Sequence, residues 1–199
     1  MKRTEIVLII LSLSSIVMKF MYWSGSGALA VLSMSSIAML YFYLGIPILL
    51  DIPLKKLFKS GTLKAIPTLR IVGAGLTGLA LSIAVIGFLF KWQGYPGATM
   101  QLMLAVFGLS VITVISVLKW NKTKVEFYQR VLKRTVVASI VVLLLLGIPH
   151  HTWLNFQFPN NPELVSAILA LEKDPDNEGL QADCDARWAD YYDHTTTNP

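Results

Sequence analysis

The sequence predicts an all-α, polytopic membrane protein that consists of a duplicated transmembrane helical hairpin, a fifth helix and a small helical tail. Of the 199 residues, 54% are hydrophobic and only 15% are charged, whereas soluble domains carry about 25% charged residues. The apolar residues form five long runs, each close to the roughly 17–25 residues that a membrane-spanning helix needs. A turn motif also occurs twice between such runs, 72 residues apart.

The repeated motif marks two tight turns. Residues 19–26 align without gaps on residues 91–98, and each copy has a lysine, then aromatic residues, then a turn of small residues. Since each copy joins two apolar runs, we predict helical hairpins over about residues 5–50 and 71–118. The motif residues of interest are Lys19, Trp23, Gly25, Lys91, Gln93, Tyr95, Pro96 and Gly97. We expect both lysines to extend to the outer headgroups beside an aromatic belt. The alternative is that they pair with helix-end carbonyls across a pseudo-symmetric bundle.

The five predicted spans cover residues 5–23, 28–50, 71–90, 98–118 and about 135–149. The last span is short, so its polar flanks would have to reach the interface by snorkelling. The first span is expected to be a retained helix, because no small-residue cleavage site follows it. No span has an acidic residue near its middle, where proton pathways usually place one. Residues 1–152 therefore form the predicted membrane domain, with the fifth helix at about 135–150, and residues 153–199 form the tail.

Basic residues set the predicted orientation. Thirteen lysines and arginines precede the first span or lie between the second and third spans and between the fourth and fifth. Five crossings place all of them on one side, which the positive-inside rule assigns to the cytoplasm. The N-terminus is then cytoplasmic and the tail extracytoplasmic. Two basic stretches, residues 54–69 and 125–132, are predicted as short helices in the headgroup layer, either as simple topology signals or as sites for specific lipids.

The tail differs from the rest of the chain in charge. Residues 1–152 carry a net charge of +12 and residues 153–199 carry −7. The overall +5 therefore reflects loop charges of a membrane protein, and we expect no nucleic-acid partner. A first tail helix begins at Asn161-Pro162-Glu163, with a cap residue, proline at the first helical position and an early acid. A second helix is expected over residues 177–192, with an apolar stripe that includes Cys184 and Trp188.

Several short motifs favour structural roles over chemical ones. The G-x-G-x-x-G pattern of residues 73–78 begins an apolar run with no βαβ context, so it predicts helix packing rather than a dinucleotide site. The acids Asp174, Asp176, Glu178 and Asp185 imitate a calcium loop weakly, and an Asp-Pro turn before a helix with early acids is the alternative. Acidic neighbours disfavour a thiolate at Cys184. We expect no catalytic constellation, no metal and no cofactor.

The second copy of the turn motif resembles a known family. Residues 90–98, Phe-Lys-Trp-Gln-Gly-Tyr-Pro-Gly-Ala, are similar to the motif Phe-Lys-Ile-Gln-His-Trp-Pro-Gly-Ala of GldL, the membrane subunit of the motor for gliding and type IX secretion in Bacteroidota. The resemblance covers about residues 83–118 and, more faintly, residues 11–40. It implies a helix–turn–helix hairpin, a bacterial inner membrane and a correspondence between Lys91 and the family's lysine at the end of its first helix. The membrane glutamate of the family's second helix has no counterpart in residues 28–50 or 98–118.

Three functions remain open from the sequence. The first is a non-catalytic structural or accessory subunit of a membrane assembly, with the lipid bilayer and a protein partner or a second copy of the chain as its contacts. The second is a small transporter or channel, which would have to line a cavity with the serines Ser12, Ser14, Ser15, Ser33, Ser35 and Ser36. The third is an enzyme of the outer membrane surface that uses His150 and His151.

Overall fold

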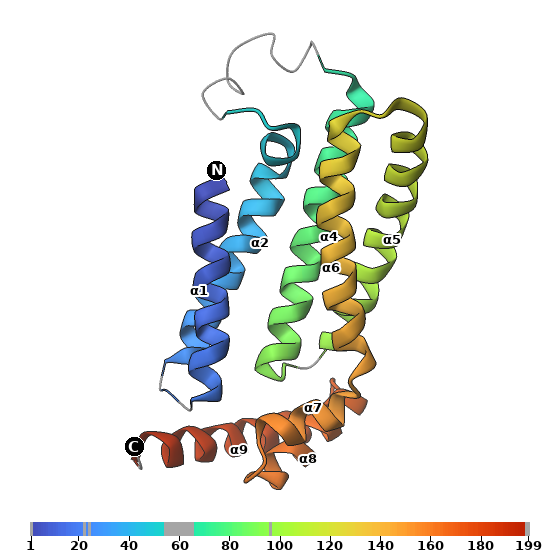
Figure 1. Ribbon diagram of the computed structural model, residues 1–199. Coiled ribbons are helices and arrows are strands. Elements are labelled where there is room, and N and C mark those ends of the chain that lie inside the picture. The colour runs from blue at the N-terminus through green and yellow to red at the C-terminus, as the bar shows by residue number, and fades with distance from the viewer. Residues whose placement is uncertain (1, 22, 24, 54–65, 96, 198–199) are drawn as a thin grey trace.

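Helices make up all the regular structure in the described part of the chain, which covers residues 2–21, 23, 25–53, 66–95 and 97–197 of a computed structural model (Figure 1). Five long helices form an antiparallel bundle: α1 (Lys2–Phe20), α2 (Ser26–Leu50), α4 (Thr68–Gln93), α5 (Ala98–Thr123) and α6 (Glu126–Gly147). Three further helices lie across one end of it: α7 (His150–Gln157), α8 (Pro162–Lys173) and α9 (Glu178–Thr197). The predicted all-α class is confirmed for these residues.

Three of the long helices are long and apolar enough to cross a membrane, namely α2, α4 and α5. Helices α6 and α7 meet the same criterion only together, and they are bent by 86° where they join. The other two predicted spans fall on α1 and α6. Charged residues lower the mean hydropathy of both helices. They lie at positions 2, 3, 5 and 19 in α1 and at positions 126, 130, 133 and 134 in α6.

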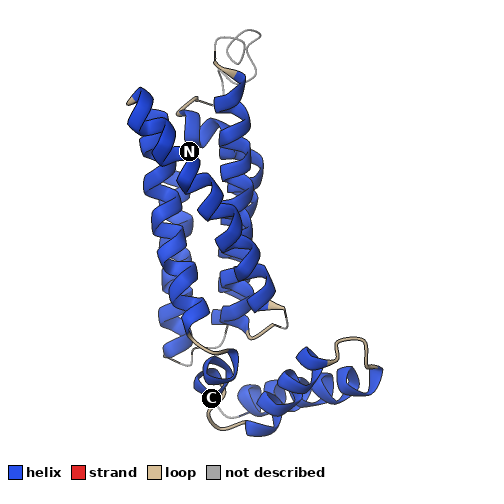
Figure 2. Ribbon diagram, turned by 90° about the vertical axis from the view of Figure 1, so that its right-hand side faces the viewer, coloured by secondary structure: helices blue, strands red, loops and turns tan. Residues whose placement is uncertain are grey.

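The two ends of the bundle differ in charge. The N-terminus, the first turn of α4 and the connection from α5 to α6 lie at one end, and the tail helices lie at the other (Figures 1 and 2). The basic residues Arg70, Lys119, Lys122, Lys124 and Arg130 belong to the first end. The hairpin topology therefore separates the bases of the loops from the acids of the tail.

Glycines bring α2 and α4 into close contact. A Cβ atom on Gly78 would lie 2.5 Å from the carbonyl oxygen of Tyr41 and 3.0 Å from the Cα of Gly45. Only glycine at both positions lets the two backbones approach this closely. A Cβ on Gly73, by contrast, would meet nothing within 4 Å. The G-x-G-x-x-G pattern lies wholly within α4, as its packing interpretation requires.

The two turns share one unusual backbone feature. Gly25 and Gly97 occupy equivalent positions of the aligned motifs, and they adopt left-handed φ values of 89° and 80°. Each is the residue before the second helix of its hairpin, α2 and α5 respectively. A residue with a Cβ would be strained there, so the glycine in each copy of the motif has a local structural reason.

Helix α1 has an inverted distribution of polarity. Its buried residues are Glu5, Ser12 and Ser15. Most of its exposed residues are apolar, namely Ile6, Val7, Ile9, Ile10, Leu11, Leu13, Val17 and Phe20, and Arg3, Thr4 and Ser14 are exposed beside them. The spacing of 5, 12, 15 and 19 places the polar side chains on one face of the helix, and this face is turned to the bundle.

The structure corrects two predictions near α6. Residues 125–132 do not form a separate surface helix, because α6 begins at Glu126 and runs unbroken to Gly147. Phe127, Tyr128 and Val131 are buried in a cluster with Leu49 and Ala74, so they pack on α2 and α4 rather than on lipid headgroups. The predicted fifth helix extended to about residue 150, but α6 ends at Gly147, and His150 lies in the first turn of α7. Of the other predicted surface helix, residues 54–65 lie outside the described part of the chain.

The tail has a small core of its own. Helix α8 begins at Pro162, as predicted, although the Asn161 side chain makes no capping hydrogen bond. Leu164 and Ile168 of α8 pack with Cys184 of α9 and with Leu154 and Phe158, which follow the bundle. The tail core is therefore continuous with α7.

We predict that Gly78→Ala destabilises the bundle and that Gly73→Ala does not. Both changes improve helix propensity equally, by about 1 kcal/mol, but only the methyl group at position 78 collides with backbone atoms. Overpacking of this kind costs about 1–3 kcal/mol. Thermal unfolding in mild detergent should show a lower melting temperature for Gly78→Ala alone. Equal melting temperatures for the two variants would contradict the close α2–α4 contact.

Candidate functional site

The first polar site joins three helices around Arg134. The guanidinium of Arg134 on α6 donates to both carboxylate oxygens of Glu5 on α1, at 2.5 and 3.0 Å. The hydroxyl of Tyr41 on α2 donates to Glu5 Oε1 at 2.5 Å and accepts from Arg134 Nη1 at 3.2 Å. The guanidinium also lies 5.8 Å from the centre of the Tyr41 ring. We call Glu5, Tyr41 and Arg134 the clasp.

The clasp is a closed arrangement of charges. Glu5 is 8% exposed and Tyr41 is 9% exposed, while the Arg134 side chain is 26% exposed, so water is largely excluded from the Glu5 carboxylate. A two-pronged contact between arginine and carboxylate neutralises both charges and fixes their geometry. Breaking a buried pair of this kind is costly, because it leaves one charge without compensation. This chemistry suits attachment of one helix to another.

The clasp does not follow from the sequence pattern. Arg134 belongs by position to the loop charges that set the predicted orientation, and no predicted span has an acid near its middle. Glu5 lies in the first turn of α1, so its position gave no sign of an internal partner. The useful signal was a single acid within the first apolar run, but 129 residues separate it from Arg134, and sequence spacing cannot pair them.

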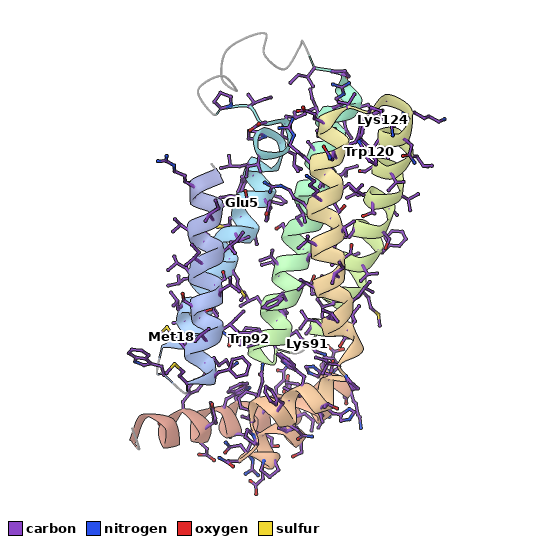
Figure 3. The ribbon with its side chains drawn as sticks, viewed as in Figure 1. Glu5, Met18, Lys91, Trp92, Trp120 and Lys124 are labelled. Carbon is purple, nitrogen blue, oxygen red and sulfur yellow. The ribbon has the colours of Figure 1, made fainter. Side chains whose placement is uncertain are left out.

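The second polar site lies where the bundle meets the tail, and it contains both motif lysines. The amine of Lys19 donates to the carbonyl of Trp92 at 2.8 Å, and the amine of Lys91 donates to the carbonyl of Ile148 at 3.0 Å. Lys91 is only 2% exposed. The expectation that these lysines extend to the headgroups is therefore wrong for Lys91. Pairing with carbonyls near helix ends, the alternative, is what the contacts show. Figure 3 shows Lys91 and Trp92 at the end of α4 nearest the tail.

Helix α7 is fastened to α4 at this junction. The indole nitrogen of Trp153 donates to the carbonyl of Lys91 at 2.5 Å, and the side-chain amide of Gln157 donates to the carbonyl of Trp92. The rings of Trp92 and Trp153 lie 5.6 Å apart. The end of α4 thus presents the carbonyls of its last turn to side chains of the tail, at the helix end where backbone acceptors lack the regular helical partners.

His150 is the titratable centre of the junction. Its side chain is 9% exposed, and its Nε2 lies 3.6 Å from Glu172 on α8. Neither ring nitrogen makes a hydrogen bond in the described part of the chain, and the same is true of Trp92 Nε1 and Gln157 Oε1. Burial lowers the pKa of His150, the charge of Glu172 raises it, and Lys91 and His151 lower it further. His151 is exposed and contacts Thr152.

The remaining motif residues take local roles. Gln93 links the two turns, because its amide donates to the carbonyl of Gly27 at 2.9 Å. Tyr95 packs edge-on against Phe90, with ring centres 5.6 Å apart. Trp23 is 62% exposed. Pro96 lies outside the described residues.

The four acids of the calcium-like pattern are not brought together. Within the described residues, no group of three or more His, Cys, Asp or Glu side chains is placed to hold a metal ion. Glu178 and Asp185 lie in α9, and Asn177 Oδ1 accepts from the backbone nitrogens of the first turn of that helix at 3.1 and 3.3 Å. The stretch is a helix start with a cap. Cys184 is buried, and burial together with the charges of Asp185 and Asp183 raises the pKa of its thiol.

The serines close on their own helices. Ser12 donates to the carbonyl of Leu8 at 3.0 Å, and Ser33 donates to the carbonyl of Leu29 at 2.7 Å. Ser15 and Ser36 make the same kind of contact. Since their hydroxyl protons are used within the helix, these side chains are not arranged as the lining of a polar passage.

Comparisons with known proteins give no relative for this chain: no family model, no curated protein and no solved structure matches it.

We predict that Arg134→Gln lowers the free energy of unfolding by about 3–5 kcal/mol, because it leaves Glu5 buried without its charge partner. Arg130→Gln is the matched control. Arg130 lies one turn away on α6 and pairs with Asp51 at 3.0 Å, but the two side chains are 35% and 52% exposed, so its loss should cost about 0–1 kcal/mol. Denaturation in mild detergent measures both. Similar losses for the two variants would contradict a buried clasp.

We also predict that the junction weakens in mild acid through His150. The folded chain binds fewer protons at His150 than the unfolded chain does, because burial lowers its pKa from 6.5. The stability that neutral His150 provides is therefore complete above pH 6.5, and it is lost as the pH falls through the folded pKa. Unfolding measured from pH 8 to pH 5 (about the range in which histidine titrates) should show this loss. His150→Gln should flatten the profile, whereas the control His151→Gln, which leaves the buried His150 imidazole in place and removes only one of the smaller influences on its pKa, should keep the loss of stability in acid.

Proposed function

We propose that this chain is an integral membrane protein with five membrane-spanning helices that serves as a non-catalytic structural or accessory subunit of a membrane assembly. The observation that carries the membrane placement is the inverted polarity of α1. Its exposed surface is mostly apolar and its buried face holds Glu5, Ser12 and Ser15. A helix in water shows the opposite pattern, whereas polar side chains in membrane helices face the bundle interior.

The other long helices support the same placement. Helix α5 exposes apolar side chains along nearly its whole length: Met100, Met103, Leu104, Phe107, Val111, Val114, Ile115, Val117 and Leu118. Helix α6 does so over residues 136–144. An apolar surface of this extent is far beyond what a soluble monomer leaves in water. Because Glu5 and Arg134 neutralise each other in the clasp, these two charges add less to the free-energy cost of placing α1 and α6 in a membrane than isolated charges would.

The tail supports the role of an accessory subunit. It carries nine of the twelve acidic residues, and it is attached to α4 by contacts of Trp153 and Gln157. Helix α9 runs along the end of the bundle (Figure 1). A rigidly fastened, charged surface at the membrane edge is suited to contact another protein, here either a different subunit or a second copy of the chain.

Two other functions receive less support. A transporter would need a polar passage, but the hydroxyls of Ser12, Ser15, Ser33 and Ser36 bond to carbonyls of their own helices. An enzyme built on the paired histidines would need both at one surface, but His150 is buried against Glu172 while His151 is exposed. The similarity of residues 90–98 to the GldL hairpin and the bases at one end of the bundle support a bacterial inner membrane, with the N-terminus inside and the tail outside.

One experiment on intact cells tests both parts of the proposal. In a Cys184→Ser background, Asp176→Cys on the tail should react with a membrane-impermeant maleimide. Lys122→Cys, equally exposed in the last turn of α5, is the control and should react only after the cells are opened. The labelled protein, extracted in mild detergent, should then run in a complex larger than its own 22.1 kDa plus detergent. Labelling of Lys122→Cys in intact cells would overturn the orientation, and a monomer without partners would overturn the subunit role.

A further inference from the structure

We propose that a groove between α4, α5 and α6 binds one acyl chain of an anionic phospholipid and that Lys119 holds its phosphate; the inference rests on the membrane placement proposed above. The groove has a volume of about 150 Å³. Its walls are Leu69, Val72, Gly73 and Leu76 of α4 and Ile112, Ile115, Ser116 and Lys119 of α5, and Thr77, Phe127, Tyr128 and Val131 complete it.

The groove exists because α4 and α5 separate toward the basic end of the bundle. Near their middles the helices touch, since a Cβ on Gly108 would lie 3.4 Å from the Cβ of Ala80. Further along, a Cβ on Gly73 would meet nothing within 4 Å. Leu76 and Ile115, on opposite walls, are 54% and 51% exposed, while Phe127 and Val131 beneath them are buried. The groove therefore has a closed floor and an open side.

The shape of the groove fits a single hydrocarbon chain. Its walls run from residue 69 to 77 on α4 and from 112 to 119 on α5, which corresponds to about 10–12 Å along the helices at 1.5 Å per residue. A helix with its side chains is about 10–12 Å across, too wide for a volume of 150 Å³. The lining is almost wholly apolar, and the hydroxyl of Thr77 donates a hydrogen bond to the carbonyl of Gly73 at 2.6 Å.

The charge at one end of the groove selects the headgroup. Lys119 is the cation in the lining, and it lies in the last two turns of α5, at the basic end of the bundle. No acidic side chain in the described part of the chain forms an ion pair with Lys119. Phe127 separates the groove from a second cavity of about 340 Å³, lined by Arg70, Arg130 and Glu126. A lipid chain along the bundle axis would thus place its phosphate beside Lys119.

Native mass spectrometry of the full chain in mild detergent tests the proposal, with phosphatidylglycerol and phosphatidylcholine as the added lipids. The wild-type chain should retain phosphatidylglycerol in preference to phosphatidylcholine. Lys119→Gln should weaken phosphatidylglycerol retention about fivefold, as expected for one cation at the membrane surface, and should leave phosphatidylcholine unchanged. Lys122→Gln, the control, removes an exposed charge from the same helix outside the groove and should keep the preference.

A second pair of variants tests the groove itself. Gly73→Leu should fill it and abolish retention of both lipids. Gly147→Leu is the control and should retain both lipids. A Cβ at Gly147 would also meet nothing within 4 Å, but Gly147 does not line the groove. Equal lipid retention by Gly73→Leu and the wild type would overturn the proposal. The proposal would also be overturned if Gly73→Leu kept its lipids but changed the mass of the protein complex, because that result indicates that the groove contacts a protein. Failure of the labelling experiment above would remove the membrane placement. Failure here alone would leave that placement intact and remove only the lipid site.

Discussion

The arrangement of the helices depends on the contact that the guanidinium of Arg134 makes with Glu5 and Tyr41. Helix α1 packs chiefly against α2, and its hydrogen-bonded link to α6 is the pair that Glu5 forms with Arg134. Tyr41 adds α2 to the same contact. Three helices from distant parts of the sequence thus share one closed set of charged and polar atoms. Both carboxylate oxygens of Glu5, the Tyr41 hydroxyl and both terminal nitrogens of Arg134 have partners within the set, so the carboxylate can be buried.

Several other polar groups of the bundle interior are also satisfied by the chain itself. Ser12 and Thr77 bond to carbonyls one turn back, and Thr113 of α5 bonds to Thr135 of α6 at 3.0 Å. Where no polar group needs a partner, small residues such as Gly45 and Gly78 let backbones touch. Both devices are characteristic of helices that pack in a lipid environment.

The two copies of the turn motif show how equivalent residues acquire different roles. Gly25 and Gly97 have the same left-handed conformation, because this depends only on the local turn. Lys19 and Lys91 both donate to carbonyls, but Lys19 reaches from the first hairpin to the second, and Lys91 reaches from the second hairpin to the end of α6. Each lysine therefore fastens its hairpin to the next part of the chain. The burial of Lys91 follows from the tail, which covers the end of α4 through Trp153 and Gln157.

The sequence by itself determined what depends on local pattern. Composition, periodicity and turn chemistry account for the helical class, the positions of α2, α4 and α5, the turn glycines, the start of α8 at Pro162 and the packing role of residues 73–78.

The tertiary structure alone decided which charges face inward. Glu5 and Arg134 lie 129 residues apart, and no periodic pattern relates them. The continuation of α6 through residues 126–134 was likewise decided by burial of Phe127 and Val131 against α2 and α4. In both cases the deciding energy is that of contacts between distant segments, which the order of residues along the chain does not express.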